Sequence, residues 1–262
     1  MKKRIFTFWE PCKNIPAYID LCMQTWQKFL PDYEIVVLDY SNLNNWIDDE
    51  CYKSILYKKF SLPKQADAIR CAVLRRHGGL WLDADTIITS DKVNELLKIS
   101  SDFVLIERHI AFIYAQPESK ILALWENEIR ERVQIYKKWH LLAQLFNRKY
   151  YKKLKSWDYM GNGILDKYLE IAGEKHFYSI DDRTINAFPE KAYYKPVQES
   201  ELIYNYRNFW FNNDFSQYIL EHKNFDIICL HNSWTPKEFK QLKQEDVFKQ
   251  DCTMSKLLQK IL

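Results

Sequence analysis

The amino-acid sequence predicts an α/β fold with a mostly parallel sheet and helices on both of its faces. Two observations lead to this prediction. Short apolar runs typical of buried strands alternate along the chain with longer segments whose apolar residues recur at helical spacing. In addition, 47% of the 262 residues are hydrophobic, which is enough to form a sizeable core. Because neither an internal repeat nor a Pro/Gly-rich linker interrupts the sequence, we expect residues 1–262 to form a single domain.

The first half of the chain contains the clearest elements. They are predicted at residues 4–9 (strand), 18–29 (helix), 34–38 (strand), 50–60 (helix), 61–77 (helix) and 80–82 (strand). Ser61 is a suitable N-cap for the last of these helices, and Pro63 lies in its first turn, where no helical hydrogen bond is lost. Apolar residues from Leu62 to Val73 follow at spacings of four, three and four, so they form one stripe on that helix.

The second half is expected to add further strands and a long helical segment. Its elements are predicted at residues 102–107 (strand), 112–115 (strand), 119–137 (helix), 163–172 (helix), 227–231 (strand) and within 236–262 (C-terminal helix). Residues 120–160 are expected to form a basic, helical insertion. Within it, residues 137–155 contain seven Lys or Arg and no acid, interleaved with apolar and aromatic side chains. Such a segment is typical either of a helix lying on an anionic membrane surface or of a solvated helix packed on the protein body.

The composition argues against several classes of protein. Lys and Arg exceed Asp and Glu by 38 − 35 = 3, and this weak excess disfavours a protein that binds nucleic acid. No apolar run approaches the roughly 18 residues of a membrane span, and the first residues do not resemble a cleaved signal peptide. The six scattered cysteines contain no CxxC pair, so free thiols in a reducing cytosol are favoured over disulfides. We expect a cytoplasmic protein, peripheral on the inner face of the membrane if residues 137–155 bind lipid.

The strongest chemical signal is the segment GGLWLDADTI at residues 78–87, which contains Asp83 and Asp85. The two carboxylates follow a short buried strand, and α/β sheets bind their ligands at the carboxyl ends of strands. There the pair can hold a hard divalent cation, Mg²⁺ or Mn²⁺, with positions left open for substrate phosphates. An Asp pair after a strand is also common in surface turns, but the flanking GG and LWL favour the metal site.

A second signal lies in the preceding helix. Asp67 and Arg70 are three residues apart, so they share one helix face, displaced from the apolar stripe. Because the helix leads directly into the Gly78-Gly79 turn and the strand before Asp83, both side chains are expected to overlook the same cleft. The alternative is an ion pair on the surface of the helix.

These residues together form a recognisable signature. Residues 61–88, SLPKQADAIRCAVLRRHGGLWLDADTII, resemble the signature of the DXD sugar-nucleotide glycosyltransferases. The resemblance is to glycosyltransferase family 32 and the bacterial capsular-polysaccharide-synthesis transferases, and more distantly to the large clostridial glucosylating toxins. Weaker similarity at RIFTFWEP, PDYEIVVLD, MGNGILDKYL and LHNSW extends it over about residues 4–236. Asn162 departs from the pattern, since relatives often carry Pro between the two glycines.

The resemblance implies a GT-A fold and a metal-dependent glycosyltransferase of bacterial surface polysaccharide synthesis. Such an enzyme moves a sugar from a nucleotide-diphosphate sugar, here expected to be a UDP-sugar, to a glycan or lipid-linked glycan acceptor. The cofactor implied is Mn²⁺ (or Mg²⁺), and the anomeric configuration is retained. Asp67 and Arg70 would bind the donor sugar, Asp83 would face the ribose and the metal, and Asp85 would ligate the metal.

Three further residues receive roles from the same resemblance. Trp9 would stack on the nucleotide base, and Trp234 would close over the diphosphate. His231 would be a third metal ligand or a diphosphate contact, although a lone His is as often structural. The capsule-type relatives act on lipid-linked acceptors at the inner face of the membrane. This chain would reach such acceptors if residues 137–155 bind the membrane surface.

Two other functions were weighed. LWLDADT also matches the strand-DxDxT pattern of haloacid-dehalogenase-like phosphohydrolases, with Asp83 as nucleophile and Asp181-Asp182 as the later acidic pair. In those enzymes the motif opens the first strand, whereas about 80 residues precede it here, and the pair Asp67 and Arg70 stays unexplained. A non-catalytic carbohydrate-binding protein would use the abundant aromatic residues, 16% of the chain, as sugar platforms, but it needs no Asp pair.

Overall fold

The computed structural model describes residues 3–53, 60–106, 109–146, 156, 158–172, 178–180, 198–221 and 226–262. Within them, six strands form one sheet in the order β2-β1-β3-β6-β5-β7. The strands are β1 (Arg4–Phe8), β2 (Glu34–Leu38), β3 (Gly79–Leu82), β5 (Phe103–Ile106), β6 (His109–Ala115) and β7 (Tyr178–Ile180). A separate antiparallel pair joins β4 (Thr86–Ile88) to β8 (Ile227–Cys229).

The predicted α/β class is confirmed, but the expectation of a mostly parallel sheet is corrected to a mixed one. The pairs β1–β2, β1–β3 and β5–β7 are parallel, whereas β3–β6 and β5–β6 are antiparallel. The reason is the short connection between β5 and β6, which leaves no room for the helical crossover that parallel neighbours require. The strand expected at 227–231 is present as β8, but it ends at Cys229 and pairs with β4 and not with the main sheet.

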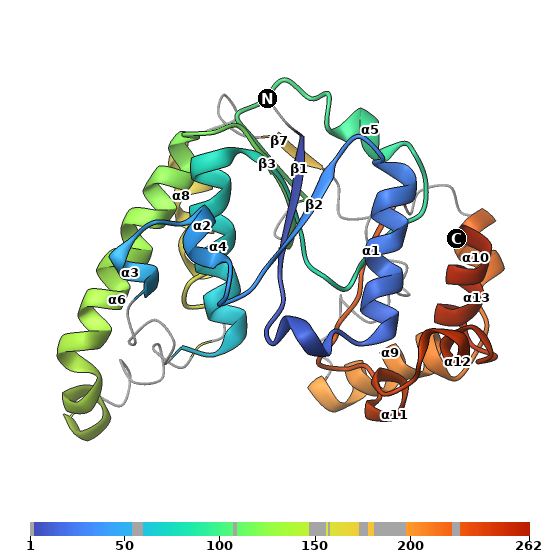
Figure 1. The fold of residues 1–262 in the computed structure, drawn as a ribbon. Coiled ribbons are helices and arrows are strands. Elements are labelled where there is room, and N and C mark those ends of the chain that lie inside the picture. Colours follow the sequence, from blue (N-terminus) through green and yellow to red (C-terminus); the bar gives the residue numbers. More distant parts are fainter. Residues whose placement is uncertain are drawn as a thin grey trace.

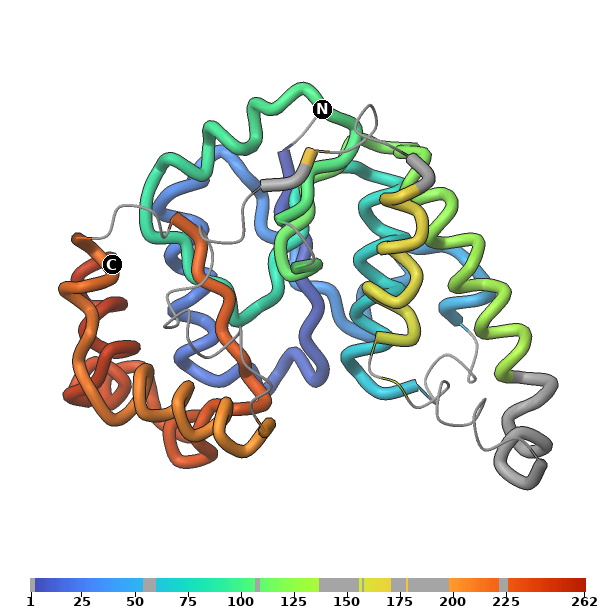
Figure 2. Tube along the Cα trace, turned by 180° about the vertical axis from the view of Figure 1, so that it is seen from behind, coloured from blue at the N-terminus to red at the C-terminus, as the bar shows by residue number. Residues whose placement is uncertain are grey.

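Helices cover both faces of the sheet, as expected (Figure 1). One face carries α4 (Leu62–His77), α6 (Lys120–Phe146) and α8 (Asn162–Ala172), and α6 packs against both of the others. The opposite face carries α1 (Ala17–Phe29), with α12 (Gln244–Phe248) and α13 (Thr253–Ile261) packed against it. Figure 2 shows the same two helical layers from behind.

Alternation along the strands explains why both faces are covered. Ile5 and Leu80 belong to the hydrophobic cluster on the α1 face, whereas their neighbours Phe6 and Trp81 belong to the cluster on the α4 face. Successive strand residues point to opposite sides of a sheet, so an uninterrupted apolar run produces two cores. The remaining helices are α2 (Leu43–Trp46), α3 (Glu50–Lys53), α5 (Val93–Leu96), α9 (Glu199–Phe211), α10 (Ser216–Glu221), α11 (Lys237–Lys240) and a 3-10 turn at Cys12–Asn14.

Two predicted helices differ from the structure. The helix expected at 119–137 continues to Phe146, and the one expected at 50–60 is described only as α3, since residues 54–59 lie outside the described part. α4 has the predicted bounds, but Leu62 of its expected apolar stripe is 43% exposed. Every residue from Asp67 to Leu74 is buried instead, because the helix is wedged between the sheet and α6.

The basic segment 137–155 lies largely outside what the structure describes. Its backbone is helical as far as Phe146, its side chains are not described, and residues 147–155 fall outside altogether. Membrane contact through this segment therefore stays a prediction. Among the helices described, none combines the length and the apolar character needed to cross a membrane. All six cysteines are free, as the sequence predicted.

Candidate active site

The Asp83 carboxylate is held in one orientation at the end of β3. Its Oδ1 accepts hydrogen bonds from Trp81 Nε1 at 2.8 Å and from Arg70 Nη2 at 2.9 Å. The backbone N–H of Asp83 donates to the Ala111 carbonyl of β6 (2.9 Å), so the main chain is fixed as well. Two donors on one oxygen leave Oδ2 as the acceptor available to a ligand, and the side chain is only half-buried.

Arg70 organises this part of the site from within α4. Its guanidinium is 3% exposed, donates to the Ile110 carbonyl through Nη1, and lies 5.1 Å from the centre of the Trp81 ring. Nη2 also lies 3.4 Å from Asp67 Oδ1, so the buried Arg70 links the buried Asp67 to the half-buried Asp83. The predicted pair of Asp67 and Arg70 is therefore not a surface ion pair, because the packing around α4 buries it.

Asp67 is an unusual carboxylate because of this burial. It is 5% exposed. The pKa of Asp67 is raised to about 7 by the combined effects of its surroundings. Burial raises it most, the neighbouring Arg70 lowers it, and the negative charges of Asp83 and Asp158 raise it. A carboxyl group with a pKa near neutrality can donate as well as accept a hydrogen bond, which suits contact with a hydroxyl-rich ligand.

Asp85 is held by a different element, the loop at residues 230–235. The Asn232 backbone N–H donates to Asp85 Oδ2 at 2.7 Å, and the Leu230 N–H donates to the Asp85 carbonyl at 3.1 Å. The Tyr18 hydroxyl of α1 donates to Asn232 Oδ1 at 2.5 Å and so anchors the loop. Burial, and then the nearby Asp83, raise the pKa of Asp85 to about 7, although the Asn232 amide and the charge of Lys240 lower it.

The same loop carries a group of aromatic rings. The His231 ring lies 4.1 Å from the Trp234 ring at an interplanar angle of 32°, and both meet the Tyr206 ring of α9 edge-on at 5.6 Å. The Tyr206 hydroxyl accepts the His231 backbone N–H at 3.1 Å. Burial, and then the neighbouring His109, lower the pKa of His231 to about 4, so its imidazole is neutral at pH 7. A neutral imidazole is the form that binds metals.

The turn before α8 closes the site on the other side. Gly161 faces Asp67 so closely that a Cβ placed there would lie 2.5 Å from Asp67 Oδ2. Trp125 Nε1 of α6 donates to the Met160 carbonyl at 2.6 Å, and Arg132 donates to the Tyr159 carbonyl. The MGNG segment, noticed in the sequence only for its glycines, is thus fixed by α6 and contacts the buried carboxylate directly.

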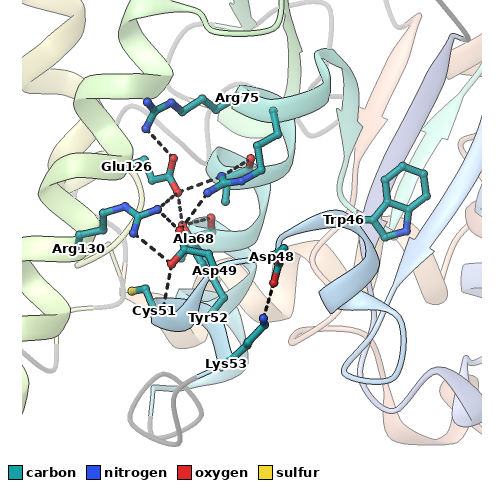
Figure 3. A network of polar contacts seen from close by, with 12 residues as sticks. Trp46, Asp48, Asp49, Cys51, Tyr52, Lys53, Ala68, Arg75, Glu126 and Arg130 are labelled. Atoms are coloured by element: carbon teal, nitrogen blue, oxygen red, sulfur yellow. Dashed lines mark hydrogen bonds and ion pairs between the residues drawn. The ribbon is translucent and has the colours of Figure 1, made fainter.

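A network of ion pairs holds α4 against α6 and the loop before α3 (Figure 3). Glu126 of α6 is fully buried and accepts from Arg75 (2.9 Å), Arg76 (3.0 Å) and Arg130 (2.8 Å). Arg76 and Arg130 also bind Asp49, at the start of the segment that leads into α3. Because Arg75 and Arg76 lie in the last turns of α4, this network fixes the helix that carries Asp67 and Arg70.

The structure places Asp67, Arg70 and Asp83 in one group of contacting charges, and Asp85 lies close enough to Asp83 for that charge to raise its pKa. Trp9 lies at the same edge of the sheet, since it follows β1, which runs parallel to β3, and its half-buried ring packs on the α1-side core. His231 and Trp234 flank the Asn232 amide that binds Asp85. In the part of the chain described, however, no three His, Cys, Asp or Glu side chains are grouped as a metal site, so a ligand role for His231 stays a prediction.

Several contributors were missed from the sequence. The hydrogen bond of Trp81 to Asp83, the carbonyl of Ile110 and the contacts of Asn232 and Tyr18 carry no local pattern. LHNSW was the only signal that pointed to the loop. Asp181 and Asp182, which the phosphohydrolase alternative requires, lie outside the described residues.

A family profile described as "Capsular polysaccharide synthesis protein" matches residues 1–249. The chain therefore belongs to the capsular polysaccharide synthesis protein family. Among curated proteins, none matches the sequence.

Comparison with solved structures finds partial similarity to glycosyltransferases. The PaToxG glycosyltransferase has a TM-score of 0.43 at 15% identity, with 66% of this chain and 70% of that chain covered. A glycosyltransferase involved in glycosylation of the major capsid of PBCV-1 has a TM-score of 0.40 at 11% identity, with 92% and 98% covered. The apo form of GlyE from Streptococcus pneumoniae TIGR4 has a TM-score of 0.46 at 12% identity; 99% of this chain aligns with 64% of GlyE. TM-scores below 0.5 reflect partial overlap of folds, so no activity is transferred from these proteins.

Proposed function

We propose that this protein is a glycosyltransferase that moves a sugar from a nucleotide-diphosphate sugar, a UDP-sugar by preference, to a glycan acceptor in surface polysaccharide synthesis. The observation that carries the proposal is the pairing of Asp83 and Asp85 at the carboxyl edge of the sheet. Each is oriented by dedicated donors, Asp83 by Arg70 and Trp81 and Asp85 by the Asn232 amide. Membership of the capsular polysaccharide synthesis protein family supports the polysaccharide role.

The two carboxylates fit a divalent cation. Asp85 is a buried carboxylate whose pKa rises because its charge is desolvated and lies close to Asp83, so a cation would relieve both effects. Oxygen ligands of this kind suit Mn²⁺ or Mg²⁺, and His231 in the loop that binds Asp85 is the candidate for a further ligand. When bound, such a cation supplies neutralisation of the charge on a departing diphosphate. Arg70 and Trp81 keep Asp83 Oδ2 directed to the ligand without reorganisation.

The remaining site residues have roles consistent with this reaction. Asp67, with its raised pKa, hydrogen-bonds donor-sugar hydroxyls, and Arg70 holds both Asp67 and Asp83 in place. Trp9 at the end of β1 stacks on the nucleotide base, and Trp234, backed by His231 and Tyr206, closes over the diphosphate. We expect retention of anomeric configuration. The acceptor is a glycan or a lipid-linked glycan, which residues 137–155 bring within reach if they bind the membrane.

The decisive experiment is a donor screen with purified protein and Mn²⁺, in which released nucleotide diphosphate is measured. EDTA in excess and the variant Asp85→Asn should each abolish release. Asp91→Asn, which makes the same change at an exposed position six residues away, should leave it intact. Full activity in EDTA would overturn the metal assignment, and release of phosphate from phosphate esters without a nucleotide sugar would point to the phosphohydrolase.

A further inference from the structure

A cavity of about 310 Å³ lies away from the Asp83 site. Six of its lining residues matter here: Lys3, Arg4, Tyr33, His77, Lys98 and Tyr114. Arg4 begins β1 and His77 ends α4 just before β3, so the cavity lies at the amino ends of parallel strands whose carboxyl ends carry Trp9 and Asp83. Strands of four or five residues separate the two edges by about 13–17 Å. The cavity is therefore not part of the candidate active site.

The lining of this cavity is basic. Lys3, Arg4 and Lys98 contribute three cations, and no Asp or Glu occurs among the lining residues that the structure describes. Arg4 is paired with Glu34 at 3.1 Å, whereas Lys3 and Lys98 are exposed and form no ion pair within the described part of the chain. Lys3 Nζ lies 5.5 Å from the centre of the Tyr33 ring, which keeps the ammonium against the cavity wall. Positive charges gathered in a hollow create a local electrostatic potential that attracts anions.

Uncharged donors complete the lining. Burial, and then the proximity of Tyr114 and Asp32, raise the pKa of Tyr33 to about 12, so its hydroxyl stays protonated at neutral pH. Gln116 adds an amide group to the same wall, whereas the Asn94 amide donates to the Phe29 and Asp91 carbonyls at 3.2 and 3.0 Å. The ammonium groups of Lys3 and Lys98, with the neutral donors of Tyr33 and Gln116 and the Glu34-paired guanidinium of Arg4 beside them, match the charge and the oxygen atoms of a phosphate group.

We propose that this cavity binds a phosphate-bearing small molecule at a site separate from the one at Asp83 and Asp85. Such a ligand would contact the turn between α4 and β3, because His77 and Gly79 line the cavity. This turn joins the helix that carries Arg70 to the strand that leads to Asp83. This connection is tightly packed: a Cβ added at Gly79 would lie 2.8 Å from the Arg4 carbonyl oxygen. The same chemistry serves free phosphate and a phosphate ester, and the test separates them.

The glycines make the site observable by NMR, because the whole chain contains only five. Gly79 lines the cavity, whereas Gly161 lies against Asp67. Inorganic phosphate and, separately, glucose 1-phosphate would be titrated into ¹⁵N-labelled protein without added metal, with chloride at equal ionic strength as the blank. We expect a saturable shift of the Gly79 amide signal with little change at Gly161. Equal affinities would identify free phosphate as the ligand, and tighter binding of glucose 1-phosphate would identify an ester.

The cations are tested with the double variant Lys3→Gln/Lys98→Gln, whose exposed positions make a folding defect unexpected. The dissociation constant read at Gly79 should rise about tenfold or more, since two charge-assisted contacts are lost. Lys243→Gln, an exposed lysine outside the cavity, should leave it unchanged. A Gly79 shift that does not saturate, that equals the chloride blank, or that persists in the double variant would overturn the proposal. None of these readouts depends on glycosyltransferase activity.

Discussion

Substituting Gly161 by alanine tests whether the turn before α8 positions Asp67. The added Cβ would lie 2.5 Å from Asp67 Oδ2, 2.9 Å from Asp67 Cγ and 2.9 Å from Ile110 Cδ1. Ordinary contacts of a carbon atom lie near 3.5–4.0 Å, so each neighbour would have to move by roughly 0.6–1 Å or more. Asp67 cannot move into solvent, since it is 5% exposed and lies on a helix packed on both sides.

The expected cost follows from overpacking a buried site. Inserting a methyl group where no space exists typically costs about 1–3 kcal/mol. For a chain of this size that corresponds to a melting temperature lower by about 2–12 °C. The displaced carboxylate would also lengthen the 3.4 Å contact with Arg70 Nη2, and Arg70 in turn orients Asp83. We therefore expect donor-dependent nucleotide release to fall together with stability.

A double-mutant cycle makes the reasoning refutable. Removing the carboxylate in Asp67→Ala creates space for the new methyl group, so Gly161→Ala should be much less destabilising in that background. The coupling from urea unfolding should be about 1 kcal/mol or more. Gly163→Ala, whose Cβ would meet Asp158 and not Asp67, is the matched control and should show no such coupling. Additive costs, or a Gly161→Ala protein with native stability and activity, would show that the turn does not hold Asp67.

Three further predictions concern the scaffold and the donor site. Glu126→Gln should lower the melting temperature by about 4 °C or more, since it weakens a fully buried carboxylate bound by three arginines; an unchanged melt would show the network to be dispensable. Burial raises the pKa of Glu128, but hydrogen bonds from Lys167, Arg132 and Tyr168 outweigh it and lower the pKa from 4.5 to about 2. The stabilisation that results is fully present above pH 4.5 and is lost as the pH falls towards 2. Urea unfolding of Glu128→Gln should therefore show a free energy of unfolding about 1–2 kcal/mol lower than that of the native protein at pH 7, and nearly equal to it near pH 2. This range is reduced because the lysine partner is exposed and the solvent screens its charge. The control variant Glu131→Gln, at an exposed position, should leave the free energy of unfolding unchanged at either pH. Trp9→Ala should weaken nucleotide binding in calorimetry by about 1–3 kcal/mol while the fold persists, and unchanged affinity would place the base elsewhere.

The unit from Ser61 to Asp85 could be predicted from the sequence because its signals are local. A proline in the first turn, a Gly-Gly stop and an apolar strand followed by two aspartates act on neighbouring residues, and the structure has α4 and β3 where they indicate. Ser61 occupies the N-cap position as expected, but its side chain makes no capping hydrogen bond. The antiparallel pairing of β5 and β6 could also have been predicted from the sequence, because two neighbouring strands separated by a few residues cannot be joined by a helical crossover. The alternation of strands and helices along the chain led instead to the expectation of a mostly parallel sheet.

Only the tertiary structure determines the burial and the hydrogen-bond partners of each charged side chain. Their spacing places Asp67 and Arg70 on one helix face, expected to overlook the cleft with a surface ion pair as the alternative, and only the packing of α4 between the sheet and α6 shows that they are buried. Asp85 receives its hydrogen bond from Asn232, 147 residues away in the chain, and Asp67 is confined by Gly161 of a distant turn. Spacing along a chain specifies which residues share a helix or strand face, whereas burial, pKa and hydrogen-bond partners depend on which distant elements pack against that face.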